Sequence, residues 1–181
     1  MSRRASGNPV SGARERLVLA RELLTLLQEQ RQAGGSHGRL LALRGATIHH
    51  AYAALVSLLQ QAANAAGVAN QANQTSLPAL ERAFEEAGVQ APELALLMQA
   101  RTHHDDLVFW LEQQLMALYA PAGLARRLLP HQHGHDDGAS LTVVTEDPYA
   151  PLQDEDLARL DATLHRVAAL IRDCAAYSAE W

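Results

Sequence analysis

The chain has 181 residues, a length that fits one domain able to bury a core without disulfides or a structural metal. Only 4% of its residues are aromatic, so the 48% hydrophobic fraction comes mainly from alanine and leucine, which favour helices over sheets. The formal charge of -5 argues against nucleic acid as a partner, and the absence of lysine among the 15 basic residues excludes Schiff-base chemistry and lysine-dependent phosphate loops.

The N-terminal segment, residues 1–11, is rich in Ser, Gly, Arg and Pro and has no apolar period, which predicts a frayed tail. A single helical domain is expected over residues 12–181. The first residues lack the apolar segment of a signal peptide, and no stretch approaches the roughly 18 apolar residues of a membrane span. We therefore expect a cytoplasmic protein without membrane contact.

Two long amphipathic helices are predicted in the first third of the chain. The first begins near Ser11 and ends at the Gly34-Gly35 pair. The second covers about residues 38–66. The apolar faces consist of Leu17, Ala20, Leu23, Leu24 and Leu27 in the first helix, and of Leu41, Ile48, Ala51, Tyr52, Leu55, Leu58, Leu59 and Ala62 in the second.

Two short helices and a longer one are predicted next. The short helices start at Ser76 with Pro78 and at Pro92. The stretch THHD from Thr102 to Asp105 has the spacing of a capping box, which predicts a break or kink before a helix that Pro121 terminates. Side chains expected in the core are Tyr52, Trp110 and Tyr119, each with its polar tip at the rim, and Met98 and Met116 as gap fillers.

Residues 121–150 form the longest irregular region, and their LTVV run at 141–144 predicts an extended segment. The last helix is expected from about Gln153, because Asp154, Glu155 and Asp156 complement its positive N-terminal end. The resulting prediction is an all-α, antiparallel helical bundle. It has four principal helices, one or two short helices, and a long irregular loop before the last helix.

The stretches RGATIHHAYAALVSLL, FWLEQQLMALY, LTVV and DEDLARLDATL, with the final Glu180-Trp181, together resemble an uncharacterised family of bacterial proteins known as a domain of unknown function. The resemblance covers most of residues 12–181. It implies no reaction, cofactor or catalytic residue. The chain departs from the family in the histidine-rich loop described next.

The stretch HQHGHDDG, from His131 to Gly138, carries His131, His133, His135, Asp136 and Asp137, which are suitable ligands for zinc, nickel or copper. In an extended strand the three histidines, which occupy alternate positions, point to the same face, but each lies about 7 Å from the next. The loop must therefore curl for them to hold one ion. We interpret the stretch as a solvated loop, with metal binding as the alternative. No cofactor is otherwise expected.

Two further features are interpreted structurally. The residues His103, His104, Asp105 and Asp106 are consecutive, so on a helix they cannot converge on one ion and instead indicate a helix N-terminus. Cys174 is the only cysteine and lies in a helical pattern near Ala175 and Ala176, which predicts a buried thiol rather than a nucleophile.

The stretch RGATIHH resembles the R-x(4-6)-H signature of the helical-bundle ribonucleases called HEPN domains, with Arg44 and either His49 or His50. About two such matches are expected by chance in this composition. On a continuous helix both histidines point more than about 100° away from Arg44. Arg44 is in line with the apolar stripe of this helix. We therefore expect its guanidinium to be paired, to reach the solvent along its aliphatic stem, or to meet a second subunit.

The motifs contain no convergent catalytic set. The leading hypothesis is therefore a non-enzymatic helical bundle that acts through protein–protein contact, through a homodimer formed by an apolar helix face or by residues 141–144. A metal-binding protein and a HEPN-like ribonuclease are the alternatives.

Overall fold

The structure, a computed structural model, describes residues 11–120 and 152–179. Within these ranges it contains six α-helices, one 3-10 turn (Gln71–Asn73) and no strand, which confirms the predicted all-α class. The helices are α1 (Ser11–Gln32), α2 (His37–Ala65), α3 (Leu77–Glu86), α4 (Pro92–Thr102), α5 (Leu107–Leu118) and α6 (Asp154–Ala179).

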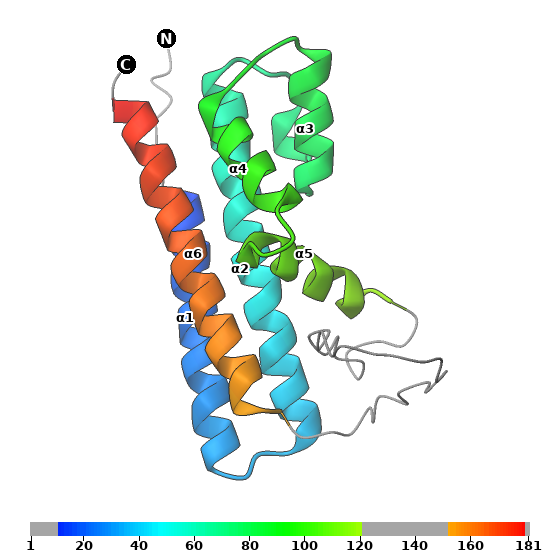
Figure 1. The fold of residues 1–181 in the computed structure, drawn as a ribbon, viewed down its shortest axis with the longest axis vertical. Coiled ribbons are helices and arrows are strands. Elements are labelled where there is room, and N and C mark those ends of the chain that lie inside the picture. The colour runs from blue at the N-terminus through cyan, green and yellow to red at the C-terminus, as the bar shows by residue number, and fades with distance from the viewer. Residues whose placement is uncertain (1–10, 121–151, 180–181) are drawn as a thin grey trace, which may run out of the picture.

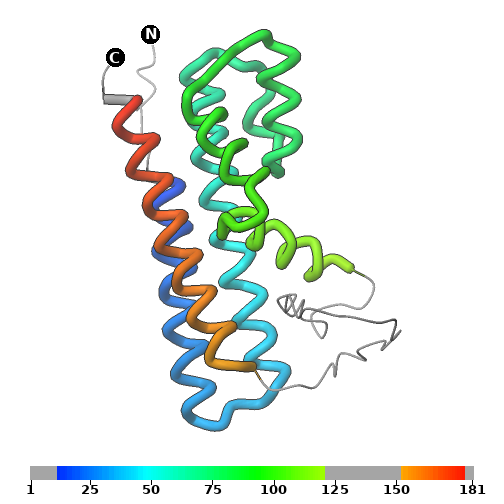
Figure 2. Tube along the Cα trace, in the orientation of Figure 1, coloured from blue at the N-terminus to red at the C-terminus, as the bar shows by residue number. Residues whose placement is uncertain are grey.

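The three longest helices, α1, α2 and α6, lie side by side and form the body of the molecule (Figure 1). Helix α1 runs antiparallel to both neighbours, whereas α2 and α6 run in the same direction (Figure 2). Helices α3 and α4 pack beside the C-terminal half of α2, and α5 crosses α2 near its middle and then points away from it.

Most of the predicted apolar stripes form the core, but Leu23 and Leu41 are only half-buried and lie outside it. In α1 the spacing of Leu17, Ala20, Leu24 and Leu27 turns one face toward α2 and α6, and all four side chains are buried. The stripes of α2 and α6 meet this face through side chains such as Ile48, Leu55, Leu59, Leu160, Leu164 and Val167. Each fully buried leucine stabilises the fold by about 1.5–3 kcal/mol, so this shared core holds the three helices together.

Glycines end the helices where the sequence predicts. After α2, Gly67 adopts a φ of +74°, and the N–H of Val68 donates to the carbonyl oxygen of Ala63 over 2.8 Å. After α3, Gly88 repeats this geometry at a φ of +64°. Because a residue without Cβ adopts positive φ at little cost, these helices stop here and the chain can turn back.

The start of α3 also matches its prediction. The hydroxyl oxygen of Ser76 accepts a hydrogen bond from the backbone N–H of Ala79 over 3.3 Å, and Pro78 lies in the first turn. The backbone N–H of Leu77 donates to the phenol oxygen of Tyr52 over 2.9 Å. The polar tip of a core tyrosine on α2 thus anchors the start of α3.

The break after α4 is confirmed, but the predicted cap is wrong. Thr102 is the last residue of α4, and its hydroxyl donates to the carbonyl oxygens of Met98 and Gln99. The residue that caps α5 is Asp106, whose carboxylate accepts from the N–H of Val108 over 2.9 Å. A hydroxyl that bonds back into its own helix cannot cap the next one.

Two side chains expected in the core lie outside it. Tyr119 is 72% exposed and Met116 is 68% exposed, because the C-terminal part of α5 points away from the other helices. Among the described helices, none combines the length and apolarity that a membrane crossing requires. The predictions for residues 1–10 and for 121–150, including the LTVV run, lie outside the described residues.

Candidate binding surface between α1 and α2

Two hydrogen bonds cross from α1 to α2 and define the outer line of contact between the helices. The guanidinium Nε of Arg16 donates to the hydroxyl oxygen of Ser57 over 2.8 Å. Fourteen residues further along α1, the side-chain oxygen of Gln30 accepts from Nη1 of Arg39 over 2.9 Å. These bonds bracket the surface that lies between them.

We call this surface the α1–α2 seam, and define it by six residues. They are Leu19, Leu23 and Leu26 of α1 and Ala46, His50 and Ala53 of α2. On each helix the three residues are spaced three or four positions apart, so they share one helical face. This face also carries the hydrogen-bonded residues at either end, Arg16 and Gln30 on α1 and Ser57 and Arg39 on α2. All six are exposed or half-buried in the structure.

The α1 side of the seam is apolar and open to solvent. Leu19 is 43% exposed and Leu26 is 45% exposed, and the neighbouring Val18 is 54% exposed. These are three of the six large hydrophobic side chains that the structure exposes within the described ranges. Leu19 and Leu26 are seven residues apart and therefore lie on the same helix face, whereas Val18 points to the adjoining face.

The α2 side of the seam consists of two alanines and His50 and lacks carboxylates, lysine and arginine. Between Gly45 and Leu80 the chain contains no Asp, Glu, Lys or Arg. The exposed and half-buried positions of this part of α2 carry only Ala, His, Gln and Asn. Loss of charged residues is the compositional mark of the centre of a protein interface.

Charge separates the two outer edges of the seam. Three glutamates, Glu15, Glu22 and Glu29, repeat every seven residues along α1, and all are exposed. Helix α2 contains no acidic residue, and its exposed positive groups are Arg39 and, when protonated, His49. One edge is therefore acidic and the other is neutral to basic.

His50 lies within the seam, under the influence of both helices. Its Nδ1 is buried and has no hydrogen-bond partner in the described part of the chain. Burial lowers the pKa of His50, and the positive charges of His49 and Arg16 lower it further. The ring therefore stays neutral at pH values where an exposed histidine is already charged.

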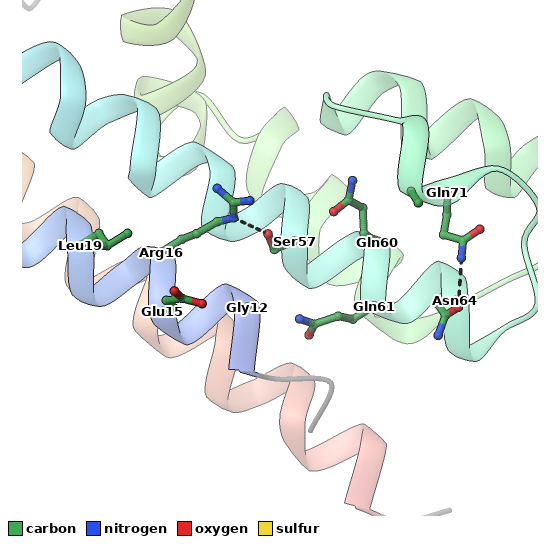
Figure 3. A pocket seen from close by; sticks show the side chains of 10 residues that line it. Gly12, Glu15, Arg16, Leu19, Ser57, Gln60, Gln61, Asn64 and Gln71 are labelled. Atoms are coloured by element: carbon green, nitrogen blue, oxygen red, sulfur yellow. Dashed lines mark hydrogen bonds between the residues drawn. The ribbon is translucent and has the colours of Figure 1, made fainter. Parts of the chain in front are cut away.

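At its Arg16 end the seam opens into a polar groove of about 550 Å³. Its walls carry Glu15, Arg16, Ser57, Gln60, Gln61, Asn64 and Gln71 (Figure 3). Leu19 belongs to both surfaces. The outer face between α1 and α2 thus has a polar end and an apolar middle.

No protein-family model, curated protein or solved structure matches this chain. The predicted resemblance to an uncharacterised bacterial family stays a prediction.

The structure places Arg44 and the two histidines of the HEPN-like signature in different surroundings. Arg44 is 3% exposed, and its Nη2 donates to the side-chain oxygen of the buried Gln114 on α5 over 2.6 Å. His49 is exposed, and His50 faces the Arg16 side of α2. Of the three outcomes expected for this arginine, the structure shows pairing, and the hydrogen-bonded group on α5 is the amide of Gln114 and not a carboxylate.

Of the other two predicted polar clusters, the structure describes residues 103–106 but not the histidine-rich loop. Asp106 serves as a helix cap, as expected for that cluster, while His103, His104 and Asp105 are exposed. Residues 11–120 and 152–179 hold no group of three His, Cys, Asp or Glu side chains arranged to bind a metal. The metal alternative at His131, His133, His135, Asp136 and Asp137 lies outside the described residues and stays a prediction.

Cys174 is buried at 1% exposure on α6, as predicted. Burial raises the pKa of its thiol to about 12, and the negative charges of Glu93 and Asp173 act in the same direction. Since the thiolate is the nucleophile, this cysteine is unreactive in the folded protein.

Proposed function

We propose that this protein acts through protein–protein contact, as a homodimer in which the α1–α2 seams of two copies face each other. The observation that carries the proposal is the row of exposed leucines on α1 beside an uncharged, alanine-lined face of α2. An isologous contact needs a surface that is complementary to itself. The seam meets this requirement in shape and in charge.

The size of the side chains supports this complementarity. In an antiparallel pair fixed by the Arg16–Ser57 and Gln30–Arg39 bonds, Leu19 is approximately level with Ala53, and Leu26 with Ala46. A twofold axis parallel to the helices keeps these levels and brings α1 of one copy against α2 of the other. Each leucine then enters a gap over an alanine, which allows close packing.

The charges favour the same axis. A twofold axis perpendicular to the helices would pair α1 with its own copy and would bring the row of Glu15, Glu22 and Glu29 beside an identical row. With the parallel axis, the glutamate edge instead lies along an α2 edge that carries no acidic residue. Repulsion between like charges disfavours the first arrangement, so we select the second.

Sedimentation velocity of the full chain at micromolar concentration tests the dimer. Leu26→Glu should produce a monomer, because two copies each lose a buried leucine and each gain a desolvated carboxylate. A loss of about 1.5–3 kcal/mol at each of the two sites weakens association by at least ~100-fold. Ala46→Glu should act in the same way from the α2 side.

Met116→Glu is the matched control, because Met116 is exposed on α5, far along the chain from the seam. It should leave the sedimentation coefficient unchanged. A wild-type chain that remains monomeric at its highest soluble concentration would exclude the proposal.

Cross-linking tests the direction of the axis in a Cys174→Ala background. A mixture of Leu26→Cys and Ala46→Cys chains should be joined by a short bismaleimide. Glu22→Cys chains alone should not be joined, because the parallel axis places these edges on opposite sides of the dimer. The reverse result would replace this arrangement by one in which α1 packs on α1.

A further inference from the structure

The groove at the Arg16 end of the seam has features that a contact between apolar helix faces does not use. Its volume of about 550 Å³ falls within the ~300–1,000 Å³ range of small-molecule sites. Its walls come from the first turns of α1, the C-terminal half of α2 and the 3-10 turn (Figure 3).

One cation of the groove is held in place. The Nε of Arg16 donates to the hydroxyl oxygen of Ser57, which is itself only 8% exposed. This bond fixes the plane of the guanidinium, and its two terminal nitrogens make no hydrogen bond with any described residue. A fixed guanidinium with free terminal donors matches the two oxygens of a carboxylate.

Side-chain amides line the rest of the groove. Gln71 donates to the side-chain oxygen of Asn64 over 3.0 Å, and Gln60 donates to the backbone oxygen of Gln74 over 2.7 Å. Gln61 points toward the start of α1 and has no hydrogen-bond partner within residues 11–120 and 152–179. Amides that combine a donor and an acceptor are suited to pair with peptide groups.

The charge of the groove restricts the ligand further. Arg16 is its only Arg or Lys among the described lining residues, and Glu15 lies on the same wall. A phosphate dianion would meet one positive and one negative charge, which is a poor match. A zwitterion would place its carboxylate on Arg16 and its ammonium on Glu15.

Another groove among the described residues lacks such an available cation. It has a volume of about 720 Å³, between the C-terminal end of α1 and the start of α6. Its arginine, Arg31, is already paired with Asp154, and Asp161 adds another negative charge.

We propose that the groove between α1 and α2 binds a short zwitterionic peptide, with the carboxylate on Arg16, the ammonium on Glu15 and the peptide groups on the amides of Gln60 and Gln61. The proposal does not depend on the dimer. Leu26 does not line the groove, so a Leu26→Glu chain should bind the peptide as the wild-type chain does.

The test is a titration of the ¹⁵N-labelled full chain with glycyl-L-glutamine, followed by NMR. Backbone signals of residues 12–19 and 57–72 should shift and saturate with a Kd of about 1 mM. Glycyl-L-glutaminamide lacks the carboxylate, and N-acetylglycyl-L-glutamine lacks the ammonium. Each should bind at least ~10-fold more weakly, because each loses one charge-assisted contact.

Arg16→Gln should weaken binding of glycyl-L-glutamine at least ~10-fold. Arg14→Gln, at an exposed position of α1 outside the groove, should have no effect. Ser57→Ala keeps the charge but frees the guanidinium, and it should give an intermediate affinity. Circular dichroism checks that each variant remains folded.

Three results would overturn the proposal. They are the absence of saturable shifts up to about 10 mM peptide, equal binding by the Arg16→Gln chain, and equal binding of the carboxamide analogue. Inorganic phosphate that displaces the peptide at equal concentration would also contradict the charge argument.

Discussion

The carboxylate of Asp106 joins α5 to α6 while it caps α5. Arg166 of α6 donates from Nη2 and Nε to Oδ2 of Asp106, over 2.7 and 3.1 Å, and its Nε also donates to Oδ1 over 3.3 Å. Oδ1 also accepts from the backbone N–H of Val108 over 2.9 Å. One side chain therefore fixes both where α5 begins and which helix its first turn lies against.

Asp106→Ala should lower the free energy of unfolding by about 2–3 kcal/mol, measured by urea denaturation. Loss of the cap accounts for about 1 kcal/mol, and the remainder comes from leaving Arg166 without its carboxylate. Asp106→Asn keeps a good cap and removes only the charge, so it should cost about half as much. Asp105→Ala changes an exposed neighbour and should remain within ~0.5 kcal/mol of the wild-type value.

A second polar cluster holds α3, α4 and α5 together. The Nε of Arg101 donates to both carboxylate oxygens of Glu112 over 2.9 Å, and its Nη1 donates to Glu81 over 3.0 Å. Burial alone would lower the pKa of Arg101, but hydrogen bonds and charge from Glu112 and Glu81 raise it overall. The arginine therefore remains charged within the fold.

Replacing Arg101 by leucine should cost about 2–4 kcal/mol in urea denaturation, because the variant leaves the half-buried carboxylate of Glu112 without compensation. The double variant Arg101→Leu and Glu112→Leu should recover part of this loss, since it removes the unpaired charge as well. Arg82→Ala, at an exposed position of α3, serves as the control. A double variant less stable than Arg101→Leu would show that packing, not charge, decides the effect.

Most of the fold could be predicted from the sequence because its signals are local. The apolar spacing in α1 and α6, Ser76 with Pro78, and the glycines at 67 and 88 place the helices within one or two residues of their observed bounds. The cap of α5 could not be chosen in this way. Both Thr102 and Asp106 have capping side chains, and only the path of the chain after α4 decides which of them is used.

The seam was missed for a different reason. The leucines of α1 at 17, 24 and 27 and those at 19, 23 and 26 lie on adjoining faces of one helix, and the sequence does not show where the neighbouring helices stop covering it. The available signal was the segment from Gly45 to Leu80, which contains no charged residue. This uncharged segment is longer than the burial of α2 in the core requires. The polar groove has no local signal, since Arg16 and Ser57 are 41 residues apart.

The half-buried ring of His50 should make stability depend on pH. Its pKa in the folded state is lowered by burial and by the charges of His49 and Arg16, whereas in the unfolded chain it is about 6.5. As the pH falls below about 6.5, the unfolded chain takes up a proton that the folded ring does not, so stability decreases until the folded pKa is reached.

Thermal or urea unfolding of the wild-type chain and of His50→Gln between pH 7.5 and about 5 measures this contribution. The difference between the two chains should be constant above about pH 7 and should shift in favour of the variant as the pH falls. His49→Gln, at an exposed position, should retain most of the dependence. Parallel curves for wild type and His50→Gln over the whole range would show that the ring titrates equally in both states.

Cys174 reports on the opening of α6. Because its thiol is buried and its pKa is raised to about 12, a thiol reagent can reach it only after the surrounding core has opened. Labelling with Ellman's reagent at pH 8 should therefore be slow in the native chain and fast in about 6 M urea. If α6 opens with the whole fold, Asp106→Ala should speed labelling by about tenfold for each ~1.4 kcal/mol of lost stability. Labelling that is fast in the native chain and independent of such variants would place the thiol at an accessible site, in conflict with its position in the core.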